Sequence, residues 1–286
     1  MIIISIHIFP HEIKRFQGIV ETFENSIKYL DDTSDILLDV SLNTNPTLID
    51  WKSETHDNIV NSFKGVCSKI SVKSNCNIHN NEMFLGVNEH RRITIKNSND
   101  SDTIIFLDSD LHFDETLLAN QLNAVEHVKH INEYYIITPQ IIKLWDNTWD
   151  CIVNHNFLKK SHDYYKTANA HEIANTNYGP VGLKPNDTFK WGGGWFNAIS
   201  ANLLKYIGIP KSFVGYGPDD TFVMECCKIM KTHNKNIQQY ILTNMVVVEN
   251  RQPIKSSTTL KTNTQDFRAN CNKQFATEVS AFRGKL

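Results

Sequence analysis

The sequence predicts an α/β fold with a mostly parallel central sheet flanked by helices. Two observations support this prediction. Short apolar runs rich in β-branched residues alternate with longer segments whose apolar residues recur every three to four positions, the spacing of one helical face. This alternation continues through the first half of the 286-residue chain. Strands separated by helices pair in parallel and are covered on both faces.

The expected elements of the first half follow in order. Ile2–Phe9 is an apolar run typical of a central strand, and Glu12–Leu30 has one apolar helical face. The Asn-Thr-Asn-Pro turn closes the next strand. Five strands are expected here: Ile2–Phe9, Asp35–Leu42, Lys69–Val72, Thr103–Leu107 and Tyr134–Thr138. The helices expected between them are Glu12–Leu30, Trp51–Phe63, Met83–Lys96 and Glu115–His130.

Periodicity weakens after Trp145 and returns at Lys190 with a glycine-rich turn. Further elements are expected there: helices over Ala198–Ile207 and Asp219–Lys231, a strand over Ile241–Val248 and a final helix over Phe267–Phe282. The apolar stripe of the final helix comprises Phe267, Cys271, Phe275, Val279 and Phe282. We expect this stripe to pack on the body of the chain, and the alternative is a homo-oligomer joined through the helix. Residues 1–250 are therefore expected to form one domain, with 251–286 as a C-terminal helical extension.

Composition argues against several classes of protein. The chain has 29 Lys and Arg against 31 Asp and Glu, a net charge of -2 that does not indicate a nucleic-acid partner. No apolar run approaches the roughly 20 residues that span a bilayer, so stable membrane insertion is not expected. The first ten residues lack the basic region and cleavage site of a signal peptide. Six scattered cysteines without a CxxC pair indicate reduced thiols, and a cytoplasmic location is expected.

An Asp-Ser-Asp triplet follows the apolar strand Thr103–Leu107 and places Asp108 and Asp110 at its carboxyl end. Ligands of parallel sheets bind outside the carboxyl ends of the strands. Two carboxylates there suit Mg²⁺ or Mn²⁺, which bind carboxylate oxygens together with substrate phosphates. The triplet therefore predicts a divalent-metal site, and the alternative is a solvated acidic turn.

Two further segments carry candidate binding residues. Trp191-Gly-Gly-Gly-Trp195 combines flat aromatic faces with Gly193 and Gly194, which let the backbone approach a ligand closely. The second segment, Gly215-Tyr-Gly-Pro-Asp-Asp220, opens an expected helix with Asp219 and Asp220. A carboxylate in a first helical turn is favoured by the helix dipole alone. As a functional group, it would serve as a general base for an acceptor hydroxyl.

Taken in order, these segments resemble the glycosyltransferases of GT-A fold, especially family 2 and its relatives. The motifs that resemble the family are FLDSD at 106–110, WGGGWFNAIS at 191–200 and GYGPDDTF at 215–222, with Arg92 lying 16 residues before Asp108. The resemblance implies a GT-A-like sheet, with a nucleotide-sugar half over about 1–110 and an acceptor half over about 111–250. It also implies that Asp220 is the catalytic base.

The resemblance assigns the other candidates as well. Asp219, Trp191, Gly193, Gly194 and Trp195 would bind the acceptor, and Arg92 and Asp108 would bind the donor. The loop after the first strand and the end of the second strand depart from the family pattern. Pro10 and Asp39 are the nearest donor-binding candidates there, with Asn43 as an alternative. The family's late metal-binding His is absent, which leaves Glu249 to join Asp110 and Asp108 as metal ligands.

The function that follows is a metal-dependent transfer of a sugar from a UDP- or GDP-sugar to an acceptor hydroxyl, with inversion of the anomeric carbon. Mn²⁺ or Mg²⁺ would be the cofactor. Two alternatives stay open. A phosphatase of haloacid-dehalogenase type also uses a DxD after a strand, although its nucleophile normally follows the first strand. The other alternative is a non-catalytic nucleotide-sugar-binding protein on the same fold.

Overall fold

The computed structural model describes residues 1–144, 152–153, 164, 167–189, 196–250 and 256–286. Its main sheet has the strand order β4-β2-β1-β5-β10-β7-β11-β6, with β8 paired to β7 and β9 to β11. The parallel strands are β1 (Ile2–Ile8), β2 (Ile36–Asn43), β4 (Lys73–His79), β5 (Thr103–Leu107), β7 (Tyr134–Leu144) and β11 (Ile237–Asn250). The antiparallel strands are β6 (Leu111–Phe113), β8 (Ile152–Val153), β9 (Gly182–Asn186) and β10 (Asn197–Ser200). The mostly parallel sheet is confirmed.

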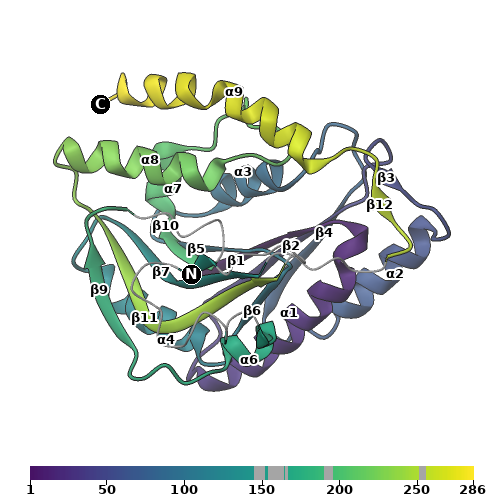
Figure 1. The fold of residues 1–286 in the computed structure, drawn as a ribbon, viewed down its shortest axis with the longest axis horizontal. Coiled ribbons are helices and arrows are strands. Elements are labelled where there is room, and N and C mark those ends of the chain that lie inside the picture. Colours follow the sequence, from purple (N-terminus) through teal and green to yellow (C-terminus); the bar gives the residue numbers. More distant parts are fainter. Residues whose placement is uncertain (145–151, 154–163, 165–166, 190–195, 251–255) are drawn as a thin grey trace.

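Helices cover both faces of this sheet (Figure 1). One layer contains α1 (Ile13–Ser26), α2 (His56–Cys67) and α4 (Leu117–Val128), which pack on the even-numbered side chains of β1. The other layer contains α3 (Val87–Asn97), α7 (Ala201–Ile207) and α8 (Asp219–Thr232). The shorter helical segments are Pro10–Glu12, Ile27–Tyr29 and α6 (Ala170–Ala174). The carboxyl ends of the parallel strands, where the candidate site lies, are therefore flanked by both layers.

Several expected elements form with ends shifted by a few residues, and two others differ in position or type. The strand expected over Lys69–Val72 forms instead over β4, whose polar sequence lies at the sheet edge with most side chains exposed. The helix expected over Ala198–Ile207 begins only at Ala201, because residues 197–200 form β10 between β5 and β7. Both errors come from pairing between strands, which local periodicity does not record.

The C-terminal segment packs within the chain, as expected. The short strand β12 (Thr259–Leu260) pairs with β3 (Ile49–Asp50), and α9 (Thr264–Arg283) then lies along α8 (Figure 1). Cys271 and Phe282 of its apolar stripe are buried. The Phe275 ring stacks with that of Phe213, with centroids 6.3 Å apart. The segment therefore spans from the β3 region to the helix that carries Asp219 and Asp220.

Among the described residues, no helix is long and apolar enough to cross a membrane.

The helix α3 approaches the loop before α8 so closely that a glycine is needed between them. A Cβ atom on Gly86 would lie 2.7 Å from the backbone oxygen of Gly215, whereas one on Gly65, at an exposed position of α2, would meet nothing within 4 Å. We expect Gly86→Ala to lower the free energy of unfolding by about 1–3 kcal/mol through overpacking. Gly65→Ala should raise it by about 0.5–1 kcal/mol. Urea unfolding of both variants checks this, and equal effects would contradict the close approach.

Candidate active site

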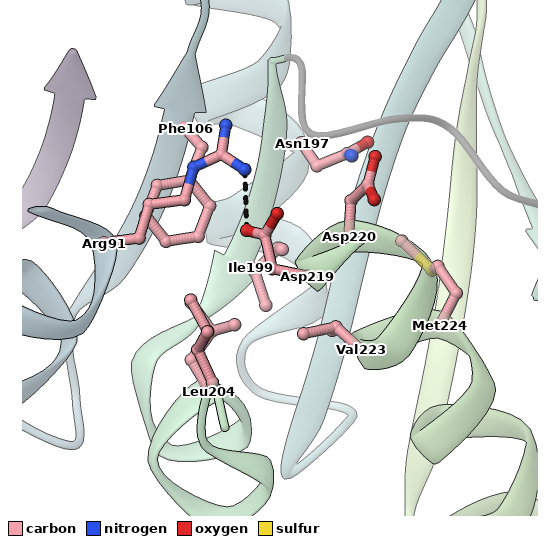
Figure 2. Close-up of a pocket in the computed structure, with 10 residues that line it drawn as sticks. Arg91, Phe106, Asn197, Ile199, Leu204, Asp219, Asp220, Val223 and Met224 are labelled. Carbon is pink, nitrogen blue, oxygen red and sulfur yellow. Dashed lines mark hydrogen bonds and ion pairs between the residues drawn. The ribbon is translucent and has the colours of Figure 1, made fainter. Parts of the chain in front are cut away.

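An arginine on α3 joins the end of β5 to the start of α8. Arg91 donates from Nη2 to Asp108 Oδ1 at 3.0 Å and from Nη1 to Asp219 Oδ2 at 2.7 Å. Its guanidinium carbon lies 4.8 Å from the centre of the Phe106 ring (Figure 2). Only 5% of Arg91 and 4% of Asp219 are exposed. Asp108 and Asp219, more than a hundred residues apart in sequence, therefore both form ion pairs with the buried Arg91.

The charges of this cluster shift one another. Burial, opposed by Arg91 and assisted by the carboxylates of Glu249, Asp219 and Asp220, raises the pKa of Asp108 to about 7. Burial also raises the pKa of Asp219, again opposed by Arg91. Burial disfavours the charged form of Arg91, but Asp219 and Asp108 outweigh this and keep its pKa above the ordinary value. Burial is thus the main reason that both carboxyl groups hold their protons more tightly than usual, and Arg91 opposes it.

The two acids that open α8 point in different directions. The Asp219 carboxylate turns toward Arg91, whereas the Asp220 carboxylate extends toward the side chain of Asn197 (Figure 2). Asp220 is partly exposed, and its Oδ1 accepts the backbone N–H of Thr221 at 2.6 Å. Adjacent residues on a helix diverge by about 100°. Asp220 is therefore the acid of this pair that a ligand can reach, and Asp219 is already engaged.

The predicted metal ligands are not gathered at one point. Asp108 binds Arg91, whereas Asp110 lines a groove of about 620 Å³ between α1, β6 and α6. Glu249 is 1% exposed and pairs in the sheet with Leu111 of β6. No three His, Cys, Asp or Glu side chains of the described chain are placed to hold a metal ion together. The donor set, all carboxylate oxygens with excess negative charge, nevertheless fits Mg²⁺ or Mn²⁺ in its chemistry.

The neighbouring Arg92 lies outside the carboxylate cluster. Its guanidinium pairs with Glu89 at 2.8 Å and donates to backbone carbonyls of the loop before α8. Sequence spacing pointed to Arg92, and the residue that contacts the DxD is Arg91. A helical wheel of α3 could not separate the two, because which arginine meets the sheet depends on how the helix packs.

The predicted donor residues on the first strands are buried. Pro10 follows β1, and Glu12 then accepts the Phe9 N–H at 2.8 Å and the Ser109 hydroxyl at 2.6 Å. Glu12 thereby ties the loop after β1 to the DxD loop. Asp39, 9% exposed, accepts the Thr94 hydroxyl at 2.7 Å.

Asp39 belongs to a polar network between α3 and the sheet. Ser5 lies 3.0 Å from His90 Nε2 and 3.1 Å from the Thr94 hydroxyl, and His90 lies 3.9 Å from Asp39. On the same face of the sheet, His7 Nδ1 lies 2.7 Å from Ser41 Oγ. The helix that carries Arg91 is therefore seated on the sheet by polar contacts.

This network predicts a loss of stability in mild acid. Burial lowers the pKa of His90 to about 4, although Asp39 opposes this, and burial also lowers that of His7. Between pH 6.5 and 4, His90 is protonated in the unfolded chain but stays neutral in the folded chain, where it is buried. Stability should therefore fall with pH by up to about 1.4 kcal/mol per unit for each such histidine.

The test is urea unfolding at a series of pH values. His90→Gln should show a shallower loss of stability across this window than the parent, while the exposed-site variant His130→Gln should follow the parent. Parallel curves for His90→Gln and the parent would show that His90 does not carry the effect.

Four predicted acceptor residues, Trp191, Gly193, Gly194 and Trp195, lie outside the described residues. Their acceptor-binding role stays a prediction.

Comparisons with known proteins identify the fold. No protein-family model matches the sequence, and no curated protein matches it. The crystal structure of S. aureus TarS residues 1–349 in complex with UDP-GlcNAc is similar over 97% of this chain and 66% of that one, with 12% identity and a TM-score of 0.53. The complex of the same protein with UDP is similar over 88% and 61%, with 13% identity and a TM-score of 0.50. GalNAc-T7 with UDP, GalNAc and Mn²⁺ matches over 90% and 46%, with 9% identity and a TM-score of 0.49.

This chain thus spans about two thirds or less of the length of each TarS chain that it matches. The structural neighbours are GT-A glycosyltransferases. The protein therefore has a GT-A-like fold: a mostly parallel α/β sheet flanked by helices, with a long C-terminal helix.

Proposed function

We propose that this protein is a metal-dependent glycosyltransferase that moves a sugar from a nucleoside-diphosphate sugar to an acceptor hydroxyl. The observation that carries the proposal is the joining of Asp108 and Asp219 by Arg91, with Asp220 beside them, at the carboxyl end of β5. In parallel sheets this edge is where ligands bind. The GT-A-like fold and its likeness to a UDP-GlcNAc complex support a nucleotide-sugar donor, either a UDP- or a GDP-sugar.

Asp220 is the proposed catalytic base. Its carboxylate is partly exposed at the first turn of α8, where an acceptor can reach it. It takes the proton of the acceptor hydroxyl while the oxygen attacks the anomeric carbon. The bond from that carbon to the diphosphate oxygen breaks, and the nucleoside diphosphate leaves. A base on the acceptor side implies a single in-line displacement, which inverts the anomeric carbon.

Arg91 and Asp219 hold the geometry of this reaction. Asp219 is buried on Arg91, so we assign it to orienting the arginine and the start of α8 instead of to binding acceptor. Arg91 neutralises part of the carboxylate charge that would otherwise repel a diphosphate. Asp39 and Pro10 are assigned to shaping the donor half, since both are buried.

A divalent cation would be held by Asp110, with Asp108 and Glu249 contributing negative charge nearby. When bound together with the diphosphate oxygens, Mg²⁺ or Mn²⁺ neutralises the charge that develops on the leaving group. Asp110 is the proposed first ligand because it lines the groove between α1, β6 and α6.

A thermal-shift screen of nucleotide sugars, with and without Mn²⁺, tests donor and metal binding together. A ligand that binds only the native state raises the free energy of unfolding, by about 2.7 kcal/mol at a hundredfold excess over Kd, and the melting temperature rises with it. We expect a UDP- or GDP-sugar to stabilise the parent more with Mn²⁺ than without. Asp110→Asn should lose the Mn²⁺-dependent part, while Asp100→Asn, at an exposed site, should keep it. No shift with any nucleotide sugar would contradict the proposal.

A further inference from the structure

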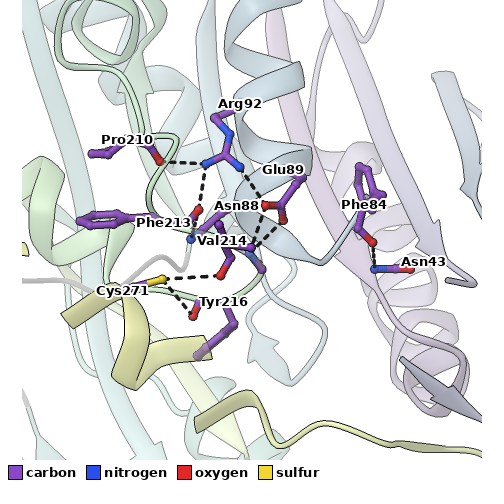
Figure 3. A network of polar contacts seen from close by, with 11 residues as sticks. Asn43, Phe84, Asn88, Glu89, Arg92, Pro210, Phe213, Val214, Tyr216 and Cys271 are labelled. Carbon is purple, nitrogen blue, oxygen red and sulfur yellow. Dashed lines mark hydrogen bonds and ion pairs between the residues drawn. The ribbon is translucent and has the colours of Figure 1, made fainter. Parts of the chain in front are cut away.

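The ion pair between Glu89 and Arg92 binds the backbone of the loop that precedes α8 (Figure 3). Arg92 Nη1 donates to the carbonyl oxygens of Pro210 at 3.0 Å and Phe213 at 2.9 Å. Its Nη2 donates to Glu89 Oε1 at 2.8 Å. Glu89 in turn accepts the backbone N–H of Gly215, 3.1 Å from each carboxylate oxygen. One ion pair therefore holds three backbone groups of the loop.

The first turn of α3 also binds this loop, through the backbone and the side chain of Asn88. Asn88 N–H donates to the Gly215 carbonyl at 3.0 Å, and Asn88 Nδ2 donates to the Phe213 carbonyl at 3.3 Å. The first N–H groups of a helix lack acceptors within the helix. The Gly215 carbonyl is the acceptor for one of these groups, the N–H of Asn88. Both the N–H and the C=O of Gly215 are thus bound by α3.

The other side of the loop is closed by α9. The Cys271 thiol donates to the Val214 carbonyl at 3.5 Å. A Cβ atom on Gly217 would lie 2.8 Å from Cys271 Sγ and 2.9 Å from Asn88 Nδ2. Gly215 has φ of +70°, and a Cβ there would lie 3.0 Å from the Phe267 ring. The backbone of residues 213–217 is therefore enclosed between α3 and α9.

This enclosed backbone leads directly into the candidate acids. Two residues after Gly217, α8 begins with Asp219, whose carboxylate is bound by Arg91 of the same α3. Glu89, Arg91 and Arg92 thus connect one rigid helix to the loop and to the first side chain of α8. Asp220 is the next residue in the chain, so these contacts also fix its position.

We propose that Glu89 and Arg92 are positioning residues: their ion pair clamps residues 210–215 onto α3 and thereby places Asp220 for its reaction. The proposal rests on the proposed function, in which Asp220 is the base. A displacement of a reacting group by about 1 Å costs on the order of 10²-fold in rate. Loss of the clamp should therefore reduce turnover without removing a group that touches substrate.

The first limb of the test is hydrogen–deuterium exchange of the chain without substrate. Glu89→Gln and Arg92→Gln break the ion pair, and Arg92→Lys keeps the charge but loses the planar fork. Glu126→Gln is the matched control, because its pair with Lys129 is also an i,i+3 pair but lies exposed on α4. We expect peptides covering 213–217 to exchange about 10- to 100-fold faster in the two Gln variants, less in Arg92→Lys, and unchanged in the control.

The second limb is steady-state kinetics with donor affinity measured in parallel. The two Gln variants should lose about 10- to 100-fold in kcat while donor Kd changes less than about twofold. Arg92→Lys should recover part of the loss, and Glu126→Gln should match the parent.

The two limbs separate the possible failures. Unchanged exchange at 213–217 would overturn the clamp, and so would full kcat in a variant whose loop exchanges faster. If the parent transfers no sugar but the variants still loosen this loop, the proposed function fails and the clamp on the start of α8 stands.

Discussion

Arg91→Met is expected to lower the free energy of unfolding by about 3–5 kcal/mol at pH 8. Removing one partner of a buried ion pair leaves an uncompensated buried charge, and here two carboxylates, Asp219 and Asp108, lose the same cation. The remaining acids should take up protons more readily in the folded state than in the unfolded state. The stability of the variant should therefore fall as pH rises. Urea unfolding from pH 6 to pH 8 measures both effects.

Two further variants test the cause of this loss. Lys96→Met removes an exposed cation from the same helix and should change stability by less than about 0.5 kcal/mol. Adding Asp219→Asn to Arg91→Met should recover part of the loss, because it removes one of the stranded charges, with a coupling of about 0.5–3 kcal/mol. Strictly additive effects would show that Arg91 does not act through Asp219.

Asp220→Asn is expected to lower kcat by about 10²–10⁴-fold, the usual contribution of general-base catalysis. The amide keeps an oxygen that can accept the Thr221 N–H, so the start of α8 should be preserved. Donor affinity and the melting temperature should therefore stay close to those of the parent. Steady-state kinetics with an acceptor, together with donor titration, measures these three quantities.

Turnover of Asp220→Asn at the rate of the parent would remove Asp220 from the role of base. A retaining mechanism without this base would then have to be considered. Asp219→Asn gives a different expected result, because Asp219 is bound to Arg91 and its loss should lower stability as well as rate.

The sequence predicted those elements whose local residue pattern agrees with their packing in the structure. Strand β5 has the expected bounds, because the apolar run Ile104–Leu107 ends abruptly at Asp108. Helix α8 begins at Asp219, as expected, since Pro218 and two acids mark its first turn. Adjacent helical side chains diverge by about 100°, which accounts for the different directions of Asp219 and Asp220.

The choice between Arg91 and Arg92 could not be made from apolar periodicity, because α3 packs on the sheet through polar residues. The apolar Ile93 is 41% exposed, whereas the polar His90 and Arg91 of the same helix are buried. The sequence of the strands contains the pattern that indicates a polar contact with α3. In β1 and β2 polar residues alternate with Ile, Leu and Val, which gives one polar face of the sheet: Ser5, His7, Asp39 and Ser41. A polar face buried under a helix requires a polar helix face.

Above all, we expect the protein to break the bond between a sugar and a nucleoside diphosphate. The most direct measurement is the release of nucleoside diphosphate from a panel of UDP- and GDP-sugars with Mn²⁺, since transferases often pass sugar to water when acceptor is missing. We expect release from at least one donor by the parent, and much less by Asp110→Asn and without divalent metal. Background release from every donor, by a chain that still binds a nucleotide sugar, would contradict the claim and identify a non-catalytic nucleotide-sugar-binding protein.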